Sequence, residues 1–359
     1  MFFRSYRENP PSLLRMFAIF GLTVIVLCGV TTITTTAQTN RSAYLDFTGD
    51  GKTDWAVFTP LPASGQPYRL KILGNQTGSA PSPPLIRIFD YGLSNDILLF
   101  GDYIGDRKTD LVAWRRGQSN NIFYTAQFPI GTGGIVLDRA VQWGAETDGV
   151  AHGDYDGDGK MDYTAIRRIG NSLTWFILSS STGAMRVINF GSAAPGFFPI
   201  RGADFTGDGR DELVVASEIN GTLTYYVGDA VTGAWLFTRQ WGFTNPFIDR
   251  RPPLADYTGD GKADFVAVRR TGSTLVWYIL DPASNTSTAT LWGIGGAGSQ
   301  SDIPVAGDYD GDGRSDIAVY RPTNQTFYVL KSSDNGLIVQ PWGEAGDHPL
   351  DVPTFIVIA

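Results

Sequence analysis

The chain has 359 residues, with 43 glycines, 20 prolines and 13% aromatic residues, and its formal net charge at pH 7 is −8. This length fits two average domains or one large all-β domain. Abundant glycine, proline and aromatic residues favour short strands joined by turns over a helical protein. The negative charge makes nucleic acid a poor partner.

The N-terminal segment, 1–37, is interpreted as a secretory signal peptide. Arginines precede the mostly apolar stretch 16–30, and small residues favour cleavage after Ala37. An uncleaved anchor is the alternative, although the stretch is shorter than the ~20 residues that span a bilayer. The single cysteine, Cys28, lies in this segment. The remaining chain, 38–359, therefore cannot rely on disulfides. Bound metal ions are the candidate for stabilising its fold instead.

One acidic stretch recurs six times along the rest of the chain. The last copy reads GDYDGDGRSDIAVYRP, and the copies begin their acidic parts at Asp46, Asp102, Asp154, Asp204, Asp256 and Asp308. An aromatic residue followed by glycine keeps the same interval of about 50 residues. It occurs at Tyr91-Gly92, Trp143-Gly144, Phe190-Gly191, Trp241-Gly242, Trp292-Gly293 and Trp342-Gly343. Two independent markers in phase indicate true internal repeats.

Each repeat divides into four short strands. In the last repeat these are residues 302–309, 316–321, 326–332 and 337–343, separated by the acidic loop and by turn residues. The second strands are nearly continuous apolar runs such as WAVF and FVAV, which is typical of strands buried on both faces.

A four-stranded antiparallel sheet cannot bury two apolar faces alone, but sheets stacked around an axis can. We therefore expect an all-β protein whose residues 38–359 form a single β-propeller domain of four-stranded antiparallel blades. Six blades are expected, with seven as the alternative. The tail, 351–359, resembles a further blade start, or pairs with the first blade to close the ring.

The acidic loops carry oxygen ligands in a regular pattern. Counted from the first aspartate, side-chain oxygens stand at positions 1, 3, 5 and 9, and a backbone carbonyl is expected at position 7. Glycines at positions 4 and 6 let the loop wrap around an ion. Hard oxygen ligands in this number suit Ca²⁺ better than Mg²⁺. The loop begins like an EF-hand, but it lacks the bidentate glutamate at position 12, and strands flank it.

We expect about five calcium sites. The expected ligands are Asp46, Thr48, Asp50, Lys52 and Asp54 in blade one; Asp154, Asp156, Asp158, Lys160 and Asp162 in blade three; Asp204, Thr206, Asp208, Arg210 and Glu212 in blade four; Asp256, Thr258, Asp260, Lys262 and Asp264 in blade five; and Asp308, Asp310, Asp312, Arg314 and Asp316 in blade six. The lysines and arginines would contribute only a backbone carbonyl. The glutamate of blade four either reaches the ion or distorts its site.

The loop of blade two, Asp102–Asp110, departs most from the pattern. Ile104 stands at position 3 and Arg107 at position 6, which leaves Asp102, Asp106 and Asp110. We expect weak or no binding there, with the arginine charge able to substitute for the ion.

Loops of the form DYDGDGRSD, in repeats that also carry an aromatic-glycine pair, resemble the FG-GAP and VCBS repeats of integrin alpha-subunit propellers and many secreted bacterial proteins. The resemblance covers residues 41–345. It implies calcium-bound blades, an extracellular location, and adhesion or ligand binding, without implying one substrate.

The sequence offers little for catalysis. His152 and His348 stand alone and are expected to be structural, there is no Gly-x-Ser-x-Gly motif, and the periodic carboxylates are assigned to metal. Recurring arginine pairs such as Arg115-Arg116 and repeated third-strand aromatics are expected to pack between blades, with a sugar-binding surface as the alternative.

The predicted function is that of a secreted, monomeric, calcium-binding propeller that binds a protein or carbohydrate ligand at the cell exterior and is not an enzyme. Two alternatives stay open. One is a propeller enzyme, a lyase or hydrolase, acting on polysaccharide, and the other is a scaffold without a ligand.

Overall fold

The computed structural model describes residues 44–59, 65–75, 85–117, 119–128, 135–243, 249–250, 254–297 and 300–350. The expected signal peptide, 1–37, and the tail, 351–359, lie outside these residues. All regular elements in the described part of the chain are β-strands. None of the described residues forms a helix of the length and apolarity needed to cross a bilayer.

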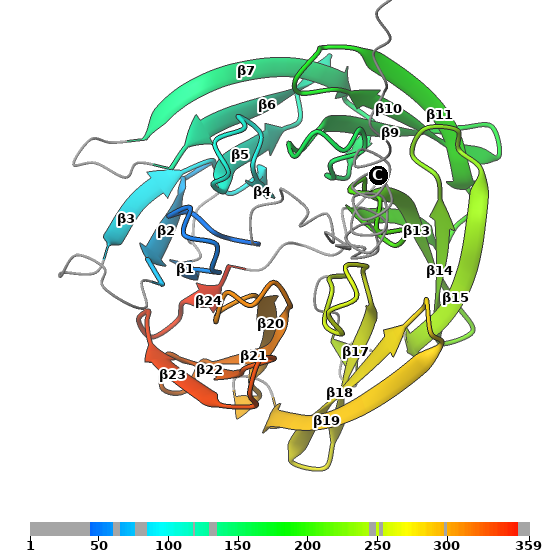
Figure 1. Cartoon of the computed structure of the whole chain (residues 1–359). Coiled ribbons are helices and arrows are strands. Elements are labelled where there is room, and N and C mark those ends of the chain that lie inside the picture. Colours follow the sequence, from blue (N-terminus) through cyan, green and yellow to red (C-terminus); the bar gives the residue numbers. More distant parts are fainter. Residues whose placement is uncertain are drawn as a thin grey trace, which may run out of the picture. The chain divides into compact units, whose positions relative to one another are not determined.

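Six four-stranded antiparallel sheets form a six-bladed β-propeller, which confirms the expected fold (Figure 1). Blades are numbered by the acidic loops that they contain. Blade one consists of β24 (His348–Pro349), β1 (Trp55–Thr59), β2 (Tyr68–Leu73) and β3 (Ile86–Tyr91). Blade two consists of β4 (Ile97–Gly101), β5 (Asp110–Arg115), β6 (Asn120–Gln127) and β7 (Val136–Ala145). Blade three consists of β8 (Gly149–Val150), β9 (Tyr163–Ile169), β10 (Ser172–Leu178) and β11 (Met185–Ser192).

The other three blades repeat this order. Blade four consists of β12 (Phe197–Ala203), β13 (Glu212–Ile219), β14 (Thr222–Gly228) and β15 (Trp235–Phe243). Blade five consists of β16 (Asp249–Arg250), β17 (Phe265–Thr271), β18 (Thr274–Asp281) and β19 (Thr286–Ile294). Blade six consists of β20 (Ile303–Gly307), β21 (Asp316–Arg321), β22 (Thr326–Leu330) and β23 (Leu337–Pro341). In Figure 1 the fourth strands lie at the periphery and the first strands lie nearer the axis.

The ring is closed by β24, which comes from the C-terminal part of the chain and pairs with β1. Val57 faces Pro349 and Phe58 faces His348 in this antiparallel pair. The Leu350 N–H then donates to the carbonyl of Ala56 at 2.8 Å. The sequence suggested that the tail, 351–359, closes the ring. The strand that pairs with β1 is instead β24, which lies just before that tail.

The aromatic-glycine landmark marks the end of each blade. The glycines of these pairs have φ between 64° and 105°, a left-handed conformation that glycine adopts without strain. In blades two to five the register between the third and fourth strands shifts near this glycine, as in a β-bulge. The tryptophan then reaches the next blade: Trp143 Nε1 donates to Phe176 O at 3.0 Å and Trp342 Nε1 to Lys71 O at 3.2 Å.

The core is divided among the seams between neighbouring blades. One apolar cluster, for example, joins Trp175 of blade three to Val215 of blade four, and another joins Trp55 of blade one to Tyr309 of blade six. The second strands are buried on both faces, as their apolar runs predicted. No blade buries its apolar faces alone, so the ring is the unit of stability.

Candidate metal centre

Each acidic loop is folded around its own first carboxylate. In blade six, Asp308 accepts the N–H of Gly311 on Oδ1 at 2.6 Å and that of Gly313 on Oδ2 at 2.8 Å. These glycines, at positions 4 and 6, have φ of 81° and 89°. Blade one repeats the arrangement with Asp46. The loop conformation is thus held by backbone N–H groups around the position-1 carboxylate.

The carboxylate at position 9 ties the loop to the end of the third strand. Asp316 accepts the N–H of Tyr309 at 2.8 Å and that of Ser332 at 2.6 Å. Asp162 is held in the same way by Tyr155 and Ser180, and Asp54 by Phe47 and Asn75. The sequence reasoning missed the partners that follow the third strand, Ser332, Ser180 and Asn75, because they lie outside the loop motif.

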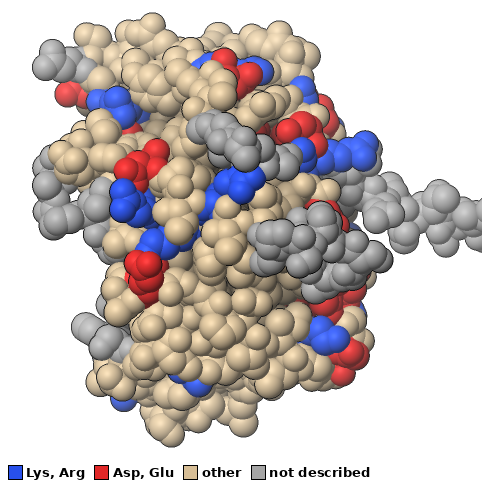
Figure 2. Space-filling view, turned by 90° about the vertical axis from the view of Figure 1, so that its left-hand side faces the viewer, with Lys and Arg blue, Asp and Glu red and all other residues tan. Residues whose placement is uncertain are grey.

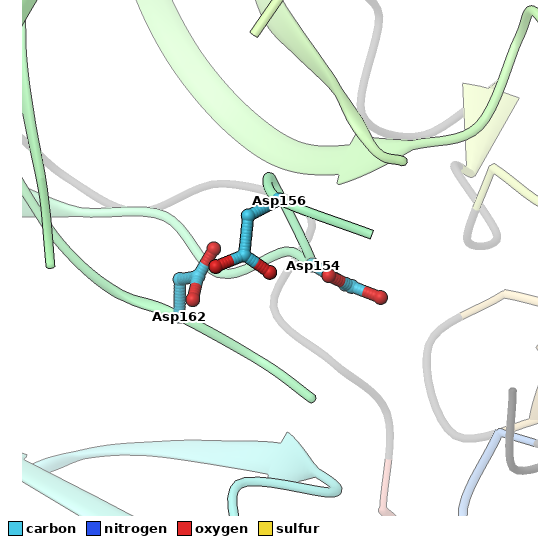
Figure 3. Close-up of side chains that lie close together, drawn as sticks. All are labelled: Asp154, Asp156 and Asp162. Atoms are coloured by element: carbon cyan, nitrogen blue, oxygen red, sulfur yellow. The ribbon is translucent and has the colours of Figure 1, made fainter. Parts of the chain in front are cut away.

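Three loops bring three carboxylates together. In each set, one oxygen from every residue lies within 4.8 Å of the others. The sets are Asp154, Asp156 and Asp162; Asp204, Asp208 and Glu212; and Asp308, Asp310 and Asp316. Figure 3 shows the carboxylates of Asp156 and Asp162 turned toward each other, with that of Asp154 beside them. The longer side chain of Glu212 reaches its set, while its oxygens also accept from Phe205 N and Thr206 Oγ1.

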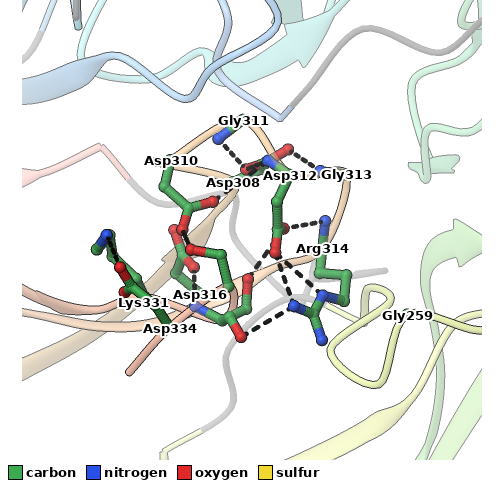
Figure 4. Close-up of polar contacts among 12 residues, drawn as sticks. Gly259, Asp308, Asp310, Gly311, Asp312, Gly313, Arg314, Asp316, Lys331 and Asp334 are labelled. Carbon is green, nitrogen blue, oxygen red and sulfur yellow. Dashed lines mark hydrogen bonds and ion pairs between the residues drawn. The ribbon is translucent and has the colours of Figure 1, made fainter. Parts of the chain in front are cut away.

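The position-5 aspartates of blades three and six, Asp158 and Asp312, are not members of these sets. Asp312 instead accepts from Arg314 at 2.8 Å and from Ser332 Oγ at 3.0 Å (Figure 4). Asp310 of the same loop accepts from Ser333 Oγ. Asp310 belongs to the blade-six set, so a cation there would compete with the hydrogen bond from Ser333 Oγ.

In blades one and five a threonine takes the place of the third carboxylate. The hydroxyls of Thr48 and Thr258 lie 3.4 Å from Oδ1 of Asp54 and Asp264, respectively. Asp50 and Asp260 accept the N–H of Lys52 and Lys262. Among the described residues these two loops contain no set of three carboxylates at the spacing given above.

The position-7 residues point their side chains at the preceding blade. A Cβ placed on the position-4 glycine of one loop would meet the position-7 side chain of the next, as Gly259 would meet Arg314 (Figure 4). Lys52, Lys160, Arg210 and Lys262 lie in the same way against Gly311, Gly105, Gly157 and Gly207. These basic side chains therefore fill the space between loops, which explains why position 4 is glycine.

A backbone hydrogen bond also joins each loop to the loop of the preceding blade. The N–H at position 8 donates to the carbonyl oxygen of the preceding loop's first aspartate. The pairs are Thr53 to Asp308 (2.7 Å), Thr109 to Asp46 (2.6 Å), Met161 to Asp102 (2.7 Å), Asp211 to Asp154 (2.7 Å), Ala263 to Asp204 (2.7 Å) and Ser315 to Asp256 (2.7 Å). The six loops thus form a closed hydrogen-bonded ring.

Burial raises the pKa of several carboxylates of these loops and so disfavours their ionised forms in the absence of a cation. It raises the pKa of Asp162 to about 7, and repulsion from Asp156 and Asp154 adds to this effect. Burial likewise raises the pKa of Glu212 to about 7 and that of Asp308 and Asp316 to about 6. A divalent cation among these oxygens would favour the ionised forms, and hard carboxylate donors fit Ca²⁺.

Blade two has the same loop backbone and fewer oxygens. Asp102 accepts the N–H of Arg107 at 2.7 Å, and Asp110 accepts the N–H groups of Tyr103 and Ile104 at 2.8 and 2.9 Å. The Arg107 side chain is exposed and makes no ion pair with a described residue. It therefore does not occupy the place of an ion, contrary to the substitution that the sequence suggested.

The third-strand aromatics and the first arginines of two pairs, which were considered for sugar binding, are engaged in packing. Trp175, Tyr225, Trp277 and Phe327 are all buried. Arg115 and Arg167 form bidentate pairs with the buried carboxylates of Asp96 and Asp148. These aromatic and arginine side chains are therefore not available to stack on a sugar.

The FG-GAP-like repeat family matches residues 204–267 and 256–319. No curated protein matches the chain. Among solved structures, a putative 6-phosphogluconolactonase from Bacteroides uniformis is 11% identical with a TM-score of 0.40, over 84% of each chain. TolB from Acinetobacter baumannii is 15% identical with a TM-score of 0.42, over 82% of this chain and 64% of that one. An exotype rhamnogalacturonan lyase, YesX, is 10% identical with a TM-score of 0.34, over 80% of this chain and 65% of that one.

Proposed function

We propose, because this chain is an FG-GAP repeat β-propeller, that it works as a calcium-stabilised binding module at the cell exterior. Its ligand is a protein or a carbohydrate. The N-terminal pattern of residues 1–37 supports an extracytoplasmic location.

The observation that carries the calcium proposal is the convergence of three carboxylates in the same loop of three blades, each set within 4.8 Å. Asp154, Asp156 and Asp162 would hold one ion, and the corresponding residues of blades four and six would hold others. A bound Ca²⁺ would neutralise carboxylates that otherwise repel one another. Weaker sites are proposed in blades one and five, where Thr48 and Thr258 replace a carboxylate.

A binding role is favoured over catalysis because the loop carboxylates are already used. Apart from Glu212, those at positions 1 and 9 accept two or more backbone N–H groups each, as Asp308 and Asp316 illustrate. On the side of the molecule in Figure 2, basic and acidic side chains lie beside one another among wide uncharged areas. This mixed surface supports a protein or carbohydrate ligand over nucleic acid.

Thermal unfolding of the full chain with and without a chelator tests the calcium proposal. Chelation is expected to lower the melting temperature by about 10 °C or more, and excess Ca²⁺ to restore it, because ions bound only by the folded state stabilise it by mass action. Mg²⁺ at the same concentration is the control. An unchanged melting temperature in chelator would contradict calcium stabilisation.

The binding role needs its own experiment. A glycan array together with a pull-down from cell-surface protein is expected to give a saturable, calcium-dependent ligand. A depolymerisation screen on acidic and neutral polysaccharides is run beside it. Turnover of any polysaccharide would replace the binding proposal with the enzymatic one.

A further inference from the structure

The inner ends of blades three and four break the repeat. Two residues before the first aspartate, blades two, five and six have Phe100, Leu254 and Ala306, whereas blade three has His152. In blade four, Arg201 stands three residues before the first aspartate, Asp204. It lies next to a register shift between β12 and β13. From the sequence, His152 was expected to be structural. Its neighbours in the fold indicate a further role.

His152 and Arg201 lie side by side on neighbouring blades. The N–H of Gly202, the residue after Arg201, donates to the carbonyl of His152 at 3.1 Å. The ring of Tyr155 reaches the same seam, since its Cζ lies 2.8 Å from where a Cβ on Gly153 would stand and its Cε1 lies 3.0 Å from the corresponding point on Gly202. From blade one, across the ring, Tyr44 presents its ring to the Arg201 guanidinium at 4.9 Å.

Tyr103 of blade two belongs to the same cluster, because the charge of Arg201 acts on its hydroxyl and its hydroxyl acts on that of Tyr155. Four side chains of this cluster have buried polar atoms without a hydrogen-bond partner in the described part of the chain. The atoms are both ring nitrogens of His152, the hydroxyls of Tyr103 and Tyr155, and Nε of Arg201. The exposed fractions of His152, Tyr103 and Tyr155 are 0%, 1% and 0%. Such buried groups are costly to leave unsatisfied, and several at one place indicate a bound partner.

The charge of the cluster indicates the sign of that partner. Arg201 is half-buried and makes no ion pair among the residues that the structure describes. The carboxylate of Asp211 borders the seam, but its Oδ2 accepts the N–H of Asp154 at 2.8 Å. A guanidinium without a counter-charge and neutral O–H and N–H donors suit an anion.

We propose that Arg201, His152, Tyr103 and Tyr155 form an oxyanion site on the axial side of blades three and four, which binds a carboxylate or a tetrahedral phosphate or sulfate group. The guanidinium supplies the charge, and the two tyrosine hydroxyls and the imidazole N–H supply neutral donors. Arg201 is the member of this set with exposed surface, so an anion from solvent meets it first. The inference specifies an acidic ligand for the proposed binding module, and to that extent it rests on the proposed function.

Isothermal titration of the calcium-loaded full chain with sodium acetate and with sodium sulfate tests the site. We expect one of the two anions to bind at one equivalent. Acetate binding alone would assign the site to carboxylates, and sulfate binding alone would assign it to tetrahedral oxyanions. Failure of both anions to bind would overturn the proposal.

Variants separate the site from general stability. Arg201→Gln is expected to weaken anion binding at least about tenfold, and Tyr103→Phe with Tyr155→Phe about tenfold together. His152→Phe copies the residue of blade two. Arg270→Gln, at an exposed arginine, is the matched control and is expected to bind as the unchanged protein does. Unaltered binding by Arg201→Gln would also overturn the proposal.

Two further readouts keep this test distinct from that of the calcium proposal. In anion-free buffer, Arg201→Gln is expected to melt no lower than the unchanged protein, because it removes an unpaired, partly buried charge. A lower melting temperature that anion does not affect would indicate a purely structural arginine. The calcium stoichiometry of the same variant is expected to be unchanged. Failure of the anion-site proposal can therefore be distinguished from failure of the calcium proposal.

Discussion

The acidic loops of blade two, 102–110, and blade six, 308–316, have the same backbone but different oxygens. In both, the position-1 carboxylate accepts the N–H of position 6, at 2.7 Å from Arg107 and 2.8 Å from Gly313. Both take part in the hydrogen-bonded ring of loops. Of these two loops, only that of blade six brings three carboxylates together. The comparison indicates that the loop joins blades without three converging carboxylates, and the proposed ion would add stability to a joint that already exists.

The largest expected effect comes from removing the position-1 carboxylate in each loop. Asp308→Ala and Asp102→Ala each remove the acceptor of two loop N–H groups, at about 0.5–1.5 kcal/mol per hydrogen bond. In chelator the two variants should therefore lose similar free energy of unfolding. In saturating Ca²⁺, Asp308→Ala should lose about 3 kcal/mol more, because it also loses the ion.

Denaturant unfolding of both variants in the two buffers measures this difference. Equal losses in Ca²⁺ would show that blade six gains nothing from an ion that blade two lacks.

The reverse change should give blade two a site. Ile104→Asp combined with Arg107→Gly restores the position-3 carboxylate and removes a non-glycine residue with φ of 65°. One additional equivalent of bound Ca²⁺ is expected, with stabilisation of up to about 3 kcal/mol at a hundredfold excess over Kd. Calcium titration by calorimetry counts the sites. Ile104→Asn, which adds no charge, is the matched control, and an unchanged stoichiometry in the double variant would contradict the assignment.

Blade two should also leave a signature in the pH dependence of stability. Burial raises the pKa of Asp110 from 3.8 to about 7. The folded state then holds this proton longer than the unfolded state, so stability falls as pH rises between 3.8 and about 7. Asp110→Asn removes this contribution and keeps an oxygen for the N–H groups of Tyr103 and Ile104. We expect it to flatten the pH profile and raise the melting temperature above pH 7 by a few degrees, roughly 2–4 °C.

Melting curves from pH 4 to pH 8 in chelator follow this effect. Asp106→Asn, at the exposed position 5 of the same loop, is the control and should leave the profile unchanged. A profile of Asp110→Asn as steep as that of the unchanged protein would rule out Asp110 as the source.

The smallest effect is expected from the turn after the third strand. Ser332 Oγ donates to Asp312 at 3.0 Å in blade six, whereas blade two has Phe128 at the equivalent place. Ser332→Ala should weaken calcium binding by blade six about fivefold, the equivalent of a hydrogen bond of about 1 kcal/mol. Competitive titration against a calcium indicator measures it, with Ser284→Ala in blade five as the control. Stronger binding by Ser332→Ala would mean that the serine competes with the ion.

The repeats made most of the fold predictable, because the same sequence pattern, an acidic loop and an aromatic-glycine pair, recurs in every blade. The period, the four strands and the buried second strand follow from the pattern around WAVF and FVAV and from the aromatic-glycine pair. The third strand of blade six ends at Leu330 rather than residue 332, because the Ser332 N–H turns to Asp316. The closing strand, β24, was not assigned because two residues carry no periodic signal.

The loop positions were readable for the same reason, but their neighbours were not. A motif shows which oxygens alternate, yet it does not show that Ser180 and Ser332 reach position 9 from another strand, or that Arg314 lies against Gly259. These contacts join segments that are distant in sequence or in different blades. The cluster around His152 was hidden because its members, Tyr103, Tyr155 and Arg201, come from three different repeats.

The position of β24 has a consequence for how the chain folds. β1 is made early in synthesis, but its edge partner, His348–Pro349, emerges only after five further blades. Until then the β1 edge has unpaired N–H and C=O groups, which are a template for pairing with another chain. Closure of so long a loop is also slow compared with the formation of a single blade. Nascent or truncated chains ending before residue 348 are therefore the forms in which strand exchange between molecules competes with completion of the ring.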